Sequence, residues 1–249
     1  MKNILIFGLL VTLLVLVQYT KAQSVDDVIN KYMEARGGKD KLLSITSITM
    51  EGSRQMMGNE VAVKVTKVQG KLSRNDFEAG GTNNFLLITD KEGWNYFAMR
   101  MQKPEPMPAD RVKAMQTELD IAGPLVDYAK KGYKAELIGK EDVEGTECYK
   151  IKMVLDSLRD ITYFIDTKSN LVIRSAQKGG MFGGGGRRGG GDMEMFTDYS
   201  DYKAVDGVMF AHTLTMKSSG GNAGPGGGGT TFDKIELNKP VDEKMYKPE

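Results

Sequence analysis

The amino-acid sequence predicts a mainly β, α+β fold with about a dozen antiparallel strands, an N-terminal helix and a mid-chain helical insertion. Three observations support this fold class. Apolar and polar residues alternate with a period of two over most of the chain, which is typical of half-buried strands. The segments between these runs are short and rich in turn-forming residues. Helical spacing of apolar residues is confined to the N-terminal region and the middle of the chain.

Residues 1–22 have the features of a signal peptide. Lys2 supplies a positive start, and an apolar run covers residues 4–17. Small residues occupy the −3 and −1 positions before a cleavage point between Ala22 and Gln23. We therefore expect export to the periplasm with cleavage at this point. An uncleaved membrane anchor is the alternative interpretation.

Composition and charge exclude some classes of protein. The formal net charge is +1 over 249 residues, so bulk electrostatics gives no indication of nucleic-acid binding. Cys148 is the only cysteine, which excludes a disulfide within the chain and fits an exported bacterial domain. No second apolar stretch is long enough to span a membrane. We expect residues 23–249 to form one soluble domain, a monomer with at most peripheral membrane contact.

The first element predicted after the signal peptide is a helix over residues 24–36. Ser24 and Asp27 form a plausible capping box at its start, and Gly37 and Gly38 end it. Its apolar residues lie at helical spacing, at Val25, Val28, Ile29, Tyr32 and Met33.

The strands are predicted in two runs, with a helical insertion between them. The first run comprises residues 48–53, 61–66, 71–77, 85–90 and 94–100. A proline-rich break at 103–108 then precedes a short helix over 110–119. Pro124 is predicted to begin a second helix, which Gly132 ends. The second run comprises residues 133–141, 146–155, 160–166, 170–177, 192–203, 207–217 and 230–238.

Two glycine-rich loops, at 179–191 and 218–229, connect strands of the second run. Successive turns of a meander alternate between the ends of a sheet, so both loops are expected at the same end. A dinucleotide-binding loop is excluded because a strand, not a helix, follows the first run. Two arginines give little affinity for RNA. Flexible hairpin tips are the favoured interpretation, with a functionless insertion as the alternative. The candidate rim residues, which could touch a membrane or gate a cavity, are Met181, Phe182, Arg187 and Arg188.

Three stretches resemble motifs of a known family. They read FLLITDKEGWNYFAM at 85–99, YFIDTKSNLVIRSA at 163–176 and TTFDKIELNKPVDEKMYKPE at 230–249. In this order they resemble the periplasmic outer-membrane lipoprotein-sorting, or lipoprotein-carrier (LolA-like), superfamily. ARGGKDKL and DYKAVDGVMF resemble variants in Bacteroidetes-type exported proteins. The resemblance implies an incomplete antiparallel half-barrel whose concave face is covered by the N-terminal helix and the helical insertion.

The same resemblance implies that the apolar space between sheet and helices binds acyl chains. The carriers have an Arg-Pro-aromatic turn, tied to ligand release, where this chain reads KVQGKLSRN at 67–75. That departure leaves true lipoprotein shuttling open. We expect a non-enzymatic binding or carrier protein for a lipid-like or lipoprotein acyl ligand, with a role in outer-membrane biogenesis. The alternative is a cell-envelope interaction module that docks a protein partner through the glycine-rich rim or a sheet edge.

Candidate residues for a ligand cavity are those whose side chains could line the concave face. Methionine is prominent among them because its flexible, polarizable side chain fills adaptable apolar surfaces. Arg54 shares the strand face of Met50; a buried guanidinium there would need a carboxylate or a ligand head group. The favoured interpretation places it in water beyond the strand end. The cavity candidates are Met50, Val63, Trp94, Met99, Met115, Met153, Met195, Phe210, His212 and Met216.

No catalytic residue, cofactor or metal site is predicted. The motifs G-x-S-x-G, H-E-x-x-H and the P-loop are missing from the sequence. His212 is the only histidine, and its strand parity favours a core or cavity position. Asp198 and Asp201 are three residues apart, so in a regular strand their side chains point to opposite faces of the sheet. Asp206 precedes Gly207, and a turn accounts for an aspartate at that position. A hydrolase that uses His212 or these aspartates is the third and weakest hypothesis.

Overall fold

The computed structural model describes residues 23–56, 58–157, 159–178, 194–219 and 228–248. The helices are α2 (Val25–Ala35), α3 (Lys39–Leu43), α4 (Ala109–Ala114), and the 3-10 turns η1 (Gln116–Leu119) and η2 (Glu243–Tyr246). The strands are β1 (Ser47–Met56), β2 (Asn59–Val68), β3 (Leu72–Ala79), β4 (Thr82–Thr89), β5 (Gly93–Tyr96), β6 (Glu105–Pro106), β7 (Lys134–Val143), β8 (Thr146–Val154), β9 (Asp160–Asp166), β10 (Val172–Lys178), β11 (Glu194–Val205), β12 (Val208–Ser218) and β13 (Gly229–Leu237).

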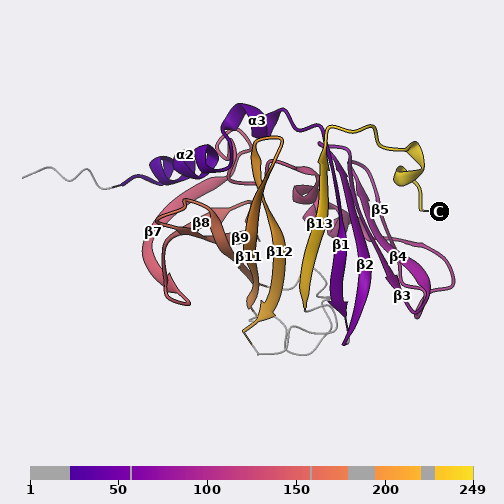
Figure 1. The fold of residues 1–249 in the computed structure, drawn as a ribbon. Coiled ribbons are helices and arrows are strands. Elements are labelled where there is room, and N and C mark those ends of the chain that lie inside the picture. The colour runs from indigo at the N-terminus through magenta and orange to yellow at the C-terminus, as the bar shows by residue number, and fades with distance from the viewer. Residues whose placement is uncertain (1–22, 57, 158, 179–193, 220–227, 249) are drawn as a thin grey trace, which may run out of the picture.

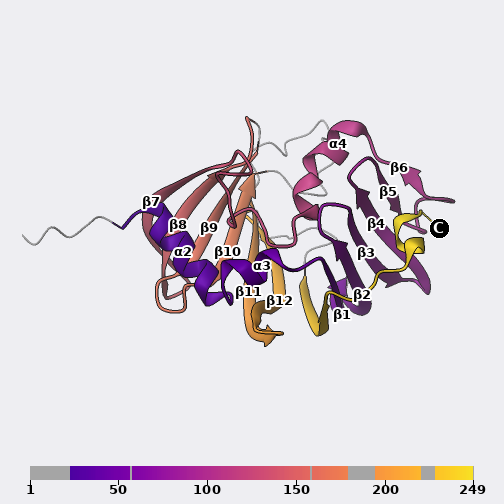
Figure 2. The ribbon, with the colours of Figure 1, turned by 90° about the horizontal axis from the view of Figure 1, so that it is seen from above.

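The strands form one curved antiparallel sheet that does not close into a barrel (Figure 1). Its order is β6-β5-β4-β3-β2-β1-β13-β12-β11-β10-β9-β8-β7. Strands that are neighbours in the chain are therefore neighbours in the sheet, except for β6 and β7, which lie at opposite edges; the first and last strands, β1 and β13, pair at the centre. The connection from β6 to β7 joins the two edges of the sheet and carries α4 and η1 (Figure 2). The predicted fold class, a mainly β half-barrel with few helices, is confirmed.

The N-terminal helix forms as its sequence predicts. The Ser24 hydroxyl accepts a hydrogen bond from Asp27 N, and Ser24 N donates to Asp27 Oδ2, both at 3.1 Å. Gly37 and Gly38 end the helix with φ of 111° and 99°. The buried face of α2 packs toward the sheet and consists of Val28, Ile29, Tyr32 and Met33.

The mid-chain insertion differs from its prediction. The expected helix over 110–119 divides at Met115 into α4 and the 3-10 turn η1. The expected helix after Pro124 is wrong, because residues 124–131 form a series of turns. Asp127 adopts a left-handed conformation with φ of 52°, which a regular helix does not accommodate. Its carboxylate forms ion pairs with Lys39 and Lys130 in this position.

The sheet is divided by a short ladder at its centre. β12 and β13 pair only over residues 213–215 and 229–231 in the described part of the chain. Beyond these residues the two strands diverge (Figure 1). The sheet thus has two halves, β7–β12 and β13–β1–β6, which share one inner core.

The C-terminal segment covers the outer face of the second half. Val241, Met245 and Tyr246 pack on a cluster of Leu72, Phe85, Leu87, Trp94 and Tyr96. The buried Arg74 holds this segment in place, because its guanidinium donates to Asp76 and to Lys247 O. Its guanidinium carbon also lies 4.4 Å from the centre of the Phe85 ring.

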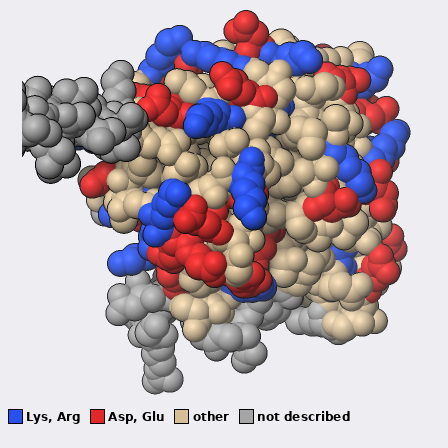
Figure 3. Space-filling view, turned by 60° about the vertical axis from the view of Figure 1, so that its left-hand side comes forward, with Lys and Arg blue, Asp and Glu red and all other residues tan. Residues whose placement is uncertain are grey.

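The outer face of the other half is charged. Lys150–Glu141 and Lys152–Asp160 form cross-strand ion pairs there, between β8 and its neighbours β7 and β9. Figure 3, which brings this side forward, shows basic and acidic side chains next to one another across the surface. Exposed ion pairs of this kind contribute little to stability.

Candidate functional site: the inner face of the half-barrel

We define the inner face as the side of the sheet that contributes to the main core cluster. This cluster joins α2 and residues 121–128 to strands of both halves of the sheet. Val28, Val126, Ile151 and Ile165 are fully buried in it. The helices and the turns after η1 therefore cover the inner face and leave the outer face to solvent and to the C-terminal segment.

Several predicted cavity residues meet on the inner face. Val63, Met153 and Phe210 are buried members of the main cluster, and Met50 packs against it in a half-buried position. They come from β1, β2, β8 and β12, so both halves of the sheet contribute.

Several apolar side chains on the inner face are only half-buried. Met50, Phe77 and Leu214 pack against the main cluster but remain half-buried. Met216 lies two residues beyond Leu214 on β12 and faces the same side of the sheet. Met195 lies on the neighbouring strand β11, opposite Ser218, and also faces this side. Both are half-buried as well. We call Met50, Phe77, Met195, Leu214 and Met216 the apolar strip.

Other predicted cavity residues lie elsewhere. Met115 is buried in a separate cluster with Leu86, Ile88 and Val112, where η1 and α4 cover β4. Trp94 belongs to the outer-face cluster beneath the C-terminal segment. Met99 is 82% exposed. The structure therefore does not bring Trp94 and Met99 to the inner face, because β5 turns its tryptophan outward and Met99 follows the end of that strand.

His212 lies where the two halves of the sheet separate. Its ring Nδ1 is 2.6 Å from Phe232 O, the carbonyl that a continued β12–β13 ladder would have engaged. Since a carbonyl only accepts, Nδ1 carries the proton. Nε2 is buried and has no hydrogen-bond partner among the described residues. His212 thus links the separated strands, and its parity with Phe210 and Leu214 confirms the predicted inner-face position.

Arg54 lies within β1 in register with Val61 and Thr230, so the interpretation that places it in water beyond the strand end is wrong. The side chain is half-buried on the face of Met50. Its Nε donates to Thr230 Oγ1 at 2.9 Å. No carboxylate of the described residues forms an ion pair with it, and burial lowers the pKa of its guanidinium.

Two tyrosines on the inner face, the buried Tyr163 and the half-buried Tyr199, are not among the predicted cavity residues. Burial raises the pKa of Tyr163 well above its usual value, and burial also raises that of Tyr199. The Tyr199 hydroxyl lies 3.1 Å from Ser175 Oγ on the neighbouring strand β10. The alternation of residues along the strands, which indicates an inner-face position for Met153, indicates the same position for both tyrosine rings. It is the sequence signal by which they could be predicted.

The predicted rim residues Met181, Phe182, Arg187 and Arg188 lie outside the described residues. The described residues on either side of the two glycine-rich segments do lie at one end of the sheet, as the meander predicts. Their strand pairs are Lys178 with Glu194, Met195 with Ser218, and Thr215 with Gly229.

The aspartates considered for catalysis have other partners. Asp198 forms ion pairs with Arg174 and Lys217 on the outer face, and Asp201 pairs with Lys203. Asp206 occupies the turn before Gly207 with φ of 50°. Within the described ranges, His, Cys, Asp and Glu side chains form no group of three that could hold a metal ion.

Cys148 is predicted to be unreactive in the native protein. It is fully buried on the outer face with Phe164 and Ala176, and burial raises the pKa of its thiol to about 11. We therefore expect no reaction with a thiol reagent such as dithiobisnitrobenzoate at pH 8 until guanidinium unfolds the chain. Rapid modification of the folded protein would contradict this packing.

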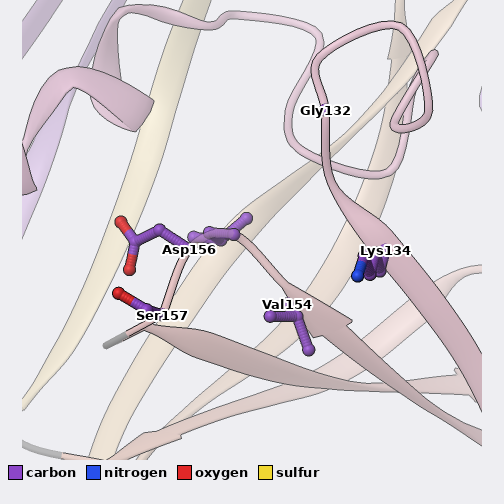
Figure 4. A pocket seen from close by; sticks show the side chains of 6 residues that line it. Gly132, Lys134, Val154, Asp156 and Ser157 are labelled. Atoms are coloured by element: carbon purple, nitrogen blue, oxygen red, sulfur yellow. The ribbon is translucent and has the colours of Figure 1, made fainter.

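A pocket of about 300 Å³ opens at the edge of the sheet near the start of β7 (Figure 4). Asp156 and Ser157 lie on one side of it and Lys134 on the other. Asp156 is already paired with Arg159 at 2.7 Å. This pocket contains no residue of the apolar strip, and we assign it no function. Its lining residues are Gly132, Lys134, Val154, Leu155, Asp156 and Ser157.

The fold and inner face define a class of protein, the open antiparallel half-barrel with helices on its concave side. Solved structures share this fold. A LolA superfamily protein from Nitrosomonas europaea superposes with a TM-score of 0.56 at 12% identity, covering 91% of this chain and 99% of the other. An outer membrane lipoprotein-sorting protein domain from Vibrio parahaemolyticus gives 0.56 at 10% identity over 88% and 94%.

A DUF1329 family protein from Desulfovibrio piger gives a TM-score of 0.55 at 11% identity, covering 91% of this chain and 98% of the other. No family model and no curated protein matches the sequence. At identities this low, the superpositions show that this chain shares the fold of these three structures. In the described part of the chain, no helix is both long and apolar enough to cross a membrane.

Proposed function

We propose that this protein is a periplasmic, non-enzymatic carrier that binds a lipid-like or lipoprotein acyl chain on its inner face, in the manner of outer-membrane lipoprotein sorting. The observation that carries the proposal is the apolar strip. Its side chains face the concave side of an open half-barrel and remain half-buried, whereas side chains that only stabilise a core are usually fully buried.

Burial of an acyl chain is sufficient to drive such binding. Each methylene group removed from water contributes about 0.8 kcal/mol, so ten of them contribute about 8 kcal/mol before the entropy cost of association. Three residues of the strip are methionines, whose side chains adapt to chains of different length and shape. Binding of this kind requires no catalytic group.

The periplasmic location rests on the predicted signal peptide. Residues 1–22 lie outside the described residues, and cleavage between Ala22 and Gln23 stays a prediction, as does the Bacteroidetes-type origin. The fold shared with lipoprotein-sorting structures supports a cell-envelope role.

The alternative function, docking of a protein partner, has less support. The glycine-rich rim lies outside the described residues. Of the sheet edges, β7 is long enough to pair with a partner strand, but Lys134, Glu136 and Lys140 project from it and its register shifts between Leu137 and Gly139. Charged side chains and bulges are features by which edge strands avoid pairing.

A matched pair of substitutions on β12 tests the carrier function. Leu214→Gln places an amide in the apolar strip, whereas Thr213→Gln places the same amide on the outer face beside the exposed residues Ser200 and Thr231. We expect Leu214→Gln to weaken binding of a fluorescent fatty acid by about tenfold, because it buries a polar group against the chain. Thr213→Gln should leave the affinity within about twofold.

The two variants must first show the same far-ultraviolet circular dichroism and a similar melting temperature. With that control, equal affinity of both variants would remove the apolar strip from the binding site. Loss of affinity in Thr213→Gln alone would place the ligand on the outer face.

A further inference from the structure

Arg54 lies on the inner face and forms no ion pair with any residue that the structure describes. Two other arginines of the sheet are neutralised, the buried Arg74 by Asp76 and the half-buried Arg174 by Asp198. Over the described ranges, the hydrogen-bond partner of Arg54 is neutral, the hydroxyl of Thr230. Desolvation lowers the pKa of its guanidinium, which means that burial disfavours the charge and no neighbouring anion compensates. An anion that binds beside the desolvated Arg54 guanidinium would therefore stabilise its charge.

The contact with Thr230 orients the guanidinium. Nε is the atom that donates to Thr230 Oγ1, so the hydrogen bond occupies one edge of the planar group. The terminal Nη1 and Nη2 groups donate to none of the described side chains or carbonyls, and so can serve as donors to a ligand. A planar pair of N–H donors matches the two oxygens of a carboxylate or a phosphate, and charge-assisted hydrogen bonds of this type are about twice as strong as neutral ones.

Arg54 also lies beside the apolar strip. Thr230 pairs in register with Arg54 on one side and with Leu214 on the other. Neighbouring strands lie about 5 Å apart, so the backbones of Arg54 and Leu214 are separated by about 10 Å. This spacing fits an amphiphile whose head group meets Arg54 and whose chain continues along Leu214 and the methionines of the strip.

We propose that Arg54 binds the anionic head group, a carboxylate or a phosphate, of the acyl ligand that lies along the apolar strip. This inference rests on the proposed carrier function and narrows it to ligands that join an oxyanion to an acyl chain. Arg54 selects an acidic lipid over a neutral ester of the same chain, while the strip provides affinity that does not depend on charge.

The test uses the purified full-length protein and three probes with the same fluorescent acyl chain: the free fatty acid, its methyl ester and a lysophosphatidylglycerol. We expect wild-type protein to bind at least one of the two anionic probes about tenfold more tightly than the ester. Arg54→Gln should abolish that difference with little change for the ester, and Arg54→Lys should retain part of it. Arg174→Gln, on the outer face, should leave all three affinities unchanged.

The outcomes separate the head-group inference from the carrier function. If wild-type protein binds none of the probes, the carrier function fails, and this inference with it. If the acid, the ester and the phospholipid bind equally and Arg54→Gln changes nothing, the carrier function stands and Arg54 is a structural partner of Thr230 only. A preference for the acid identifies a carboxylate as the ligand head group, and a preference for the phospholipid identifies a phosphate. A guanidinium denaturation curve for each variant shows whether it is folded.

Discussion

Gly52→Ala is expected to lower the free energy of unfolding by about 3 kcal/mol, because this glycine allows β1 and β13 to pair closely at the centre of the sheet. β1 and β13 shift register at a bulge between Glu51 and Gly52. A Cβ atom at Gly52 would lie 1.9 Å from Thr231 O and 2.7 Å from Phe232 Cα. Both atoms belong to the backbone of β13, so the clash is relieved only by separating the strands.

Gly229→Ala is the matched control for this substitution. Gly229 lies on the same strand β13, and a Cβ atom there would make one ordinary contact, at 3.9 Å from Thr215 Oγ1. We expect a change below about 1 kcal/mol. Urea denaturation followed by circular dichroism measures both variants. Equal stability of Gly52→Ala and Gly229→Ala would show that the β1–β13 bulge is not a tight contact.

Arg74→Ala is expected to destabilise the protein by about 3 kcal/mol and to release the C-terminal segment. Arg74 is 4% exposed, and its guanidinium joins Asp76 of the sheet to Lys247 O of the segment, at 2.9 Å and 2.7 Å. The substitution leaves a partly buried carboxylate without its cation and uncovers Leu72, Phe85 and Leu87.

Trp94 reports this change directly, because it is the only tryptophan in the chain and packs in the cluster under the segment. We expect its fluorescence to shift to longer wavelength in Arg74→Ala, together with faster proteolysis after residue 238. Arg100→Ala removes an exposed arginine and should alter neither readout. An unshifted tryptophan spectrum in Arg74→Ala would mean that the segment stays in place without the guanidinium.

Much of the fold follows from local patterns. The capping box of Ser24 and Asp27 and the alternation of the strands are determined by neighbouring residues, so the helix and nearly every strand were predicted. The helix expected after Pro124 was wrong: Asp127 has a left-handed backbone conformation and forms an ion pair with Lys39, and a residue so distant in sequence enters no local pattern. The position of Trp94 on the outer face depends on the C-terminal segment that covers it, and no local pattern contains that information.

The candidate site was predicted less completely. Strand parity correctly placed Val63, Met153 and Phe210 on one face, since burial of one face enforces the period of two. Strand parity does not show whether an inner-face residue is fully or partly buried, because its burial depends on the segments that cover it. The residues of the apolar strip, which are half-buried, could therefore not be identified from the sequence. The alternation in the sequence predicts a strand that ends at residue 53, which would place the Arg54 side chain in solvent. In the structure β1 continues to Met56, because it pairs with β2 up to that residue.

The measurement that tests the carrier function most directly is native mass spectrometry of the protein purified from the periplasm of a bacterium that expresses the full chain. We expect wild-type protein to carry a bound lipid or fatty acid, and Leu214→Gln to carry markedly less, because the apolar strip is the contact surface for the acyl chain. Protein without any lipid adduct, which also fails to bind an added fluorescent fatty acid, would contradict the proposal.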